Sequence, residues 1–66
     1  MDKVYLKLLP SEQVIASSAC HIFAAYIRAG RVGQGSESEW MERSVREAIE
    51  IARLADTLVT SDNELA

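Results

Sequence analysis

Residues 37–59 constrain the fold most, because their apolar side chains are too numerous for one neighbouring helix to cover. At 100° per residue these side chains occupy an arc of more than roughly 180°, whereas one partner helix needs only about 100°. One apolar row follows the 4-3-4-3-4 spacing of a heptad seam and contains Met41, Val45, Ala48, Ala52, Ala55 and Val59. A second row beside it contains Trp40, Ile51, Leu54 and Leu58. We therefore expect this helix to have at least two neighbours.

A preceding helix is predicted over residues 11–29. Ser11 is a suitable N-cap, and Glu12 in the first turn suits the positive end of the helix dipole. Gly30 follows the last apolar residue and is predicted to take the C′ position, where a positive φ favours glycine.

The two predicted helices are joined by a loop over residues 30–35, which holds all three glycines of the chain. Ser36 and Glu39 have the spacing of a capping box, so the second helix is expected to span 37–59. Residues 60–66 form a predicted polar tail.

Residues 1–9 are predicted to be an extended arm or a short strand. Val4, Leu6 and Leu8 alternate with polar or aromatic neighbours, which is the period-2 pattern of a half-buried strand. Pro10 ends this pattern, because a proline biases the residue before it away from the helical region.

The chain of 66 residues has room for one domain, residues 1–66, and a domain of this size buries little surface. Cys20 is the only cysteine, so no disulfide can form within the chain, and a lone thiol fits a reducing compartment. With one cysteine and one histidine, a zinc site is not expected. Oligomerisation is the remaining means of stabilisation. The predicted fold is mainly all-α: a helix–loop–helix hairpin that assembles as a four-helix-type homodimer.

Charge and hydropathy predict the localisation of the protein and the kinds of partner that it lacks. The formal net charge is −3, without the strongly basic footprint of a nucleic-acid-binding protein. No segment approaches the roughly 20 apolar residues that cross a bilayer, and the first residues lack the pattern of a signal peptide. We therefore expect a cytoplasmic protein with no membrane partner.

The side chains with reactive chemistry do not form a recognisable catalytic set. His21 has Ser17 one turn before it, but no third orienting group or oxyanion site accompanies the pair. Cys20 lies in mid-helix at the edge of the apolar arc, where cysteine acts as a small hydrophobe. We predict no catalytic residue, no metal and no cofactor, and hence a protein that is not an enzyme.

The segment 3–8 with Pro10, followed by Ser36 through Ile49, resembles the ribbon–helix–helix family of DNA-binding dimers. In that family, strands pair across the dimer and their outward side chains enter the major groove of DNA. The resemblance implies that Lys3, Tyr5 and Lys7 contact DNA. It also implies that the start of the second helix lies on a phosphate. A transcriptional regulator or antitoxin of this type is the alternative function.

The leading prediction is a small non-enzymatic helical homodimer, or a higher homo-oligomer, that acts as an interaction or accessory module, with a different protein as the alternative partner. Its predicted interface consists of Trp40, Met41, Val45, Ala48, Ile51, Ala52, Leu54, Ala55 and Leu58.

Overall fold

The computed structural model of the chain describes residues 7–65 and consists of two helices joined by a loop. Helix α1 spans Pro10–Arg28 and helix α2 spans Glu37–Leu65, and the two pack against each other. Residues 7–65 contain no strand, which confirms the predicted helical hairpin. Most of the predicted arm or strand, residues 1–6, lies outside the described part of the chain.

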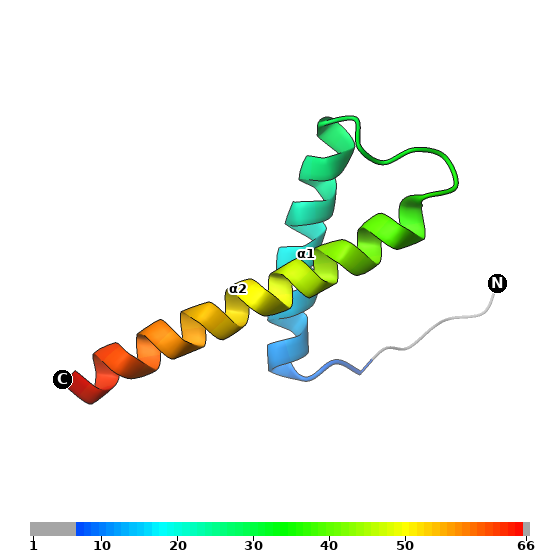
Figure 1. Cartoon of the computed structure of the whole chain (residues 1–66). Helices are drawn as coiled ribbons and strands as arrows, with labels where there is room; N and C mark the ends of the chain where they lie inside the picture. The colour runs from blue at the N-terminus through cyan, green and yellow to red at the C-terminus, as the bar shows by residue number, and fades with distance from the viewer. Residues whose placement is uncertain (1–6, 66) are drawn as a thin grey trace.

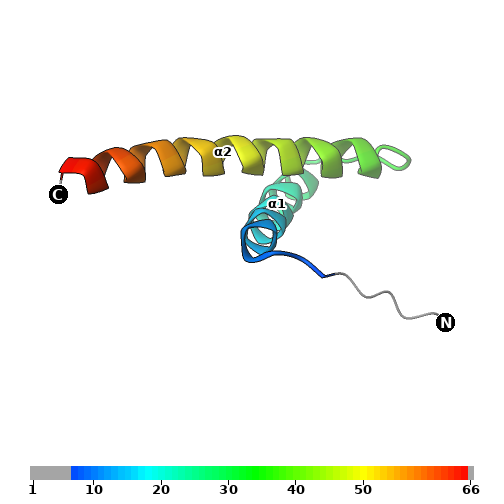
Figure 2. The same cartoon turned by 90° about the horizontal axis from the view of Figure 1, so that it is seen from below.

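The two helices cross instead of running alongside each other (Figure 1). Figure 2 shows α1 on one side of α2 and viewed nearly along its own axis, while α2 lies across it. In both views the C-terminal half of α2 projects beyond α1 with no other helix beside it. The molecule is accordingly thin, with principal extents of 48 × 32 × 15 Å.

Small side chains lie where the helices cross. Among the side chains of residues 7–59, only Ala19, Ser44 and Ala48 are buried. Side chains of this size let two helix backbones approach closely. They also contribute little apolar area, so the hairpin alone contains almost no hydrophobic core.

The first turn of α1 differs from the prediction that Ser11 is its N-cap. Leu9 takes the N-cap position, Pro10 is the first helical residue, and Ser11 lies inside the helix. The Glu12 carboxylate accepts a hydrogen bond from the Leu9 backbone N–H at 2.8 Å. Proline at this position is favourable because its missing N–H would have no partner within the helix. The N-cap prediction was therefore wrong by two residues.

The end of α1 confirms the role predicted for Gly30. Its φ is +74°, and its N–H donates to the Ile27 carbonyl oxygen at 3.0 Å. The next N–H, that of Arg31, donates to the Tyr26 carbonyl oxygen at 3.0 Å. These two bonds form a Schellman motif, which satisfies carbonyl groups at the helix end.

The capping box predicted at the start of α2 does not form. The Ser36 N–H donates to the Gly33 carbonyl oxygen at 3.1 Å, so it is not available to Glu39. The Ser36 hydroxyl also binds Gly33: it donates to the carbonyl at 2.9 Å and accepts from the N–H at 3.0 Å. Glu37 instead accepts from the Gly35 N–H at 2.8 Å. Ser36 thus closes the loop.

Helix α2 continues past the predicted end at residue 59 and reaches Leu65. Residues 60–65 were predicted to be a polar tail. The chain contains no glycine or proline after Gly35, so no residue in this stretch breaks the helix. Neither α1 nor α2, as described over residues 7–65, is long and apolar enough to cross a membrane.

Candidate interaction surface

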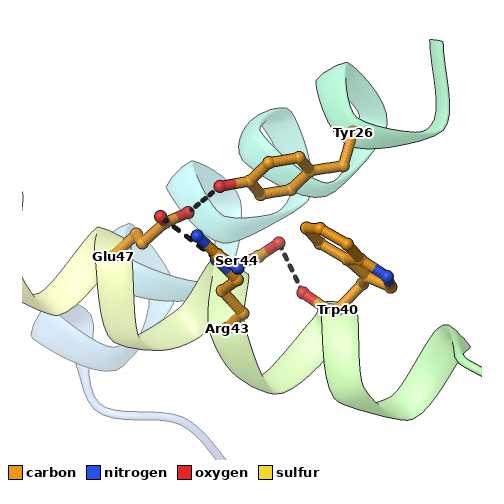
Figure 3. A network of polar contacts seen from close by, with 5 residues as sticks. All are labelled: Tyr26, Trp40, Arg43, Ser44 and Glu47. Carbon is orange, nitrogen blue, oxygen red and sulfur yellow. Dashed lines mark hydrogen bonds and ion pairs between the residues drawn. The ribbon is translucent and has the colours of Figure 1, made fainter. Parts of the chain in front are cut away.

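One side of the helix crossing is occupied by a polar–aromatic cluster of Tyr26, Trp40, Arg43 and Glu47 (Figure 3). The Tyr26 hydroxyl, from α1, donates to the Glu47 Oε1 atom at 2.6 Å. The Arg43 Nε atom lies 3.6 Å from Glu47 Oε2. Glu47 therefore links the two helices through Tyr26 and also pairs with a neighbour on its own helix.

Aromatic stacking completes this cluster. The rings of Tyr26 and Trp40 have centroids 4.6 Å apart and are tilted by 51°. The Arg43 guanidinium carbon lies 5.2 Å from the Trp40 ring centroid and 5.8 Å from that of Tyr26. Both distances suit a cation–π contact. The cluster fills the angle between the C-terminal half of α1 and the N-terminal half of α2.

The electrostatics of the cluster act on Tyr26. The hydrogen bond to Glu47 raises the pKa of the Tyr26 hydroxyl above its ordinary value. Partial desolvation and the negative charge of Glu47 raise this pKa further, whereas Arg43 opposes the shift. Tyr26 is therefore held as a neutral donor.

The sequence patterns did not reveal this cluster, because Tyr26 and Glu47 are far apart in the chain and follow no local spacing. Arg43 pairs with Glu47, four residues further along α2. There it can also stack on both rings. A second ion pair on α2 joins Glu42 and Arg46 at 3.1 Å.

The opposite side of the crossing is an open apolar groove between the N-terminal half of α1 and α2. Its larger part, about 370 Å³, is lined by Ser11, Glu12, Ile15, Ala16, Val45 and Ile49. Its second part, about 260 Å³, continues past Ala19, Cys20, Phe23 and Met41. Val45 and Ala16 line both parts, so we treat them as one apolar groove.

A second apolar surface lies on the projecting part of α2. We call Ile51, Leu54 and Leu58, whose exposed fractions are 59%, 61% and 57%, the α2 ridge. Their spacing of three and four residues places them on one face of the helix. No part of α1 covers this face.

The residues predicted to form one interface are therefore divided among three places. Ala48 is buried at the crossing and Trp40 is half-buried in the polar–aromatic cluster. Met41 and Val45 line the apolar groove and stay exposed. The remaining members lie on the projecting part of α2: Ile51, Ala52, Leu54, Ala55 and Leu58. Ala52 is half-buried there, and the other four are exposed.

The residues considered for catalysis are not brought together with other reactive groups. The His21 Nδ1 atom lies 2.9 Å from the Ser17 carbonyl oxygen, which can only accept a hydrogen bond, and the side chain is exposed. Cys20 is an exposed free thiol at the rim of the apolar groove. Within residues 7–59, no three potential ligands among His, Cys, Asp and Glu gather where they could hold a metal ion.

The residues implied by the ribbon–helix–helix resemblance are only partly described. Lys3 and Tyr5 lie outside the described residues. Lys7 is exposed and precedes α1. The first turn of α2 carries Glu37 and Glu39, whose charges repel a phosphate. DNA binding through this segment stays a prediction.

Comparisons with known proteins do not connect the chain to a family. No family model matches it, and no match was found among curated proteins or among solved structures.

Proposed function

We propose that the protein is a small non-enzymatic interaction module that works as a homodimer of helical hairpins. One observation carries the proposal: apolar side chains are exposed while the core is nearly empty. Ten large apolar side chains among residues 7–59 are at least 40% exposed, whereas only three small side chains are buried. Exposed apolar surface of this extent is typical of an interface.

A second copy is the simplest partner that covers this surface. Each copy has one apolar groove and one α2 ridge, so a two-fold arrangement covers both surfaces in both copies with one type of contact. Folding and assembly are then coupled, as expected for a chain too short to build its own core.

The proposal is tested by thermal unfolding followed by circular dichroism at a series of protein concentrations. A dimer that unfolds to monomers has a melting temperature that rises with concentration. A melting temperature that stays constant over a hundredfold range of concentration contradicts the proposal.

A gel-shift experiment with random duplex DNA at low salt separates this function from the DNA-binding alternative. Non-specific phosphate contacts give measurable affinity under these conditions. We expect no retarded DNA, because the net charge is −3 and acidic residues occupy the start of α2. A retarded band that disappears with added salt supports the alternative instead.

A further inference from the structure

We draw no further inference here: the strongest candidate, the apolar groove between the N-terminal half of α1 and α2, already belongs to the surface attributed to the proposed homodimer, and nothing in residues 7–65 shows which helix or segment covers it.

Discussion

Individual side chains at the crossing explain why α1 and α2 meet where they do. Ala19 and Ala48 keep the backbones close, and Ser44 between them donates to the Trp40 carbonyl oxygen at 2.7 Å, so its buried hydroxyl has a partner. Tyr26 and Glu47 add one hydrogen bond between the helices. These contacts orient the helices, but their apolar area is small.

The loop depends on Gly30, whose φ of +74° is costly for any residue with a Cβ atom. We expect Gly30→Ala to destabilise the fold by about 1 kcal/mol. A new Cβ atom there meets nothing within 4 Å, so the effect reports backbone strain alone. Gly33→Ala is the control, because its Cβ atom would lie 3.7 Å from Ser36 Oγ, an ordinary contact, and its φ is not positive. Urea unfolding measures the free energy of unfolding of both variants. Equal values for the two contradict the assignment of Gly30 to a C′ position with positive φ.

Tyr26 should ionise at higher pH than an ordinary tyrosine, because its hydroxyl donates to Glu47. The folded-state pKa exceeds the unfolded one, so this contribution to stability is complete below about pH 10 and is lost as the pH rises through the raised pKa. In a Tyr5→Phe background, absorbance titration reports Tyr26 alone. Glu47→Gln should lower its pKa toward the ordinary value. A titration unchanged by that substitution means that the hydrogen bond does not form in solution.

At the scale of single residues, the sequence predicted the features that depend only on neighbouring positions in the chain. Gly30 was identified because a glycine just after an apolar stripe commonly ends a helix. The polar–aromatic cluster could not be predicted, since Tyr26 meets Glu47 only after the crossing angle is set. Ser36 and Glu39 have the spacing of a capping box, but the Ser36 N–H donates to the Gly33 carbonyl oxygen inside the loop instead.

At the scale of the helices, the sequence predicted their existence and faces but not how they cross. The apolar arc of α2 identifies the side that is buried, and Ala48 on that side is indeed covered by α1. The apolar arc of α2 does not specify the angle at which α1 crosses it, because several interhelical angles bury the same face. Helix α2 is longer than predicted, because the residues after 59 are polar but include no glycine or proline that stops the helix.

The close approach of the helices predicts that enlarging a side chain at the crossing is harmful. Ala48 is 1% exposed, so Ala48→Leu has no space and should destabilise the fold by about 1–3 kcal/mol. Ala25→Leu is the matched control, because the same substitution is made at an exposed position of α1. Thermal unfolding compares the two at one concentration. A neutral Ala48→Leu variant shows that the crossing is looser than described.

At the scale of the whole molecule, the thin shape and the nearly empty core are the observations behind the proposed homodimer. The expected homodimer follows from the same excess of apolar surface that the sequence displays on residues 37–59. The structure refines this expectation, since it divides the apolar surface into the apolar groove and the α2 ridge.

A charge placed on the α2 ridge should weaken assembly without harming the contacts within one hairpin. Leu54 is 61% exposed and lies away from α1, so Leu54→Glu is expected to raise the dissociation constant of the dimer at least tenfold. Arg53→Glu, which also adds negative charge but at an exposed position turned about 100° around the helix from Leu54, should leave that constant nearly unchanged. Size-exclusion chromatography with light scattering over a dilution series measures the dissociation constant of each variant. Equal effects of the two substitutions argue against the α2 ridge as part of the dimer interface.

Sedimentation equilibrium of the native chain at micromolar concentration shows whether the proposed homodimer forms, because it measures mass independently of shape. We expect a mass twice that of the 7.3 kDa chain, falling toward the monomer mass on dilution as helical content is lost. A folded species that keeps the monomer mass at every concentration, with undiminished helical content, contradicts the proposed homodimer.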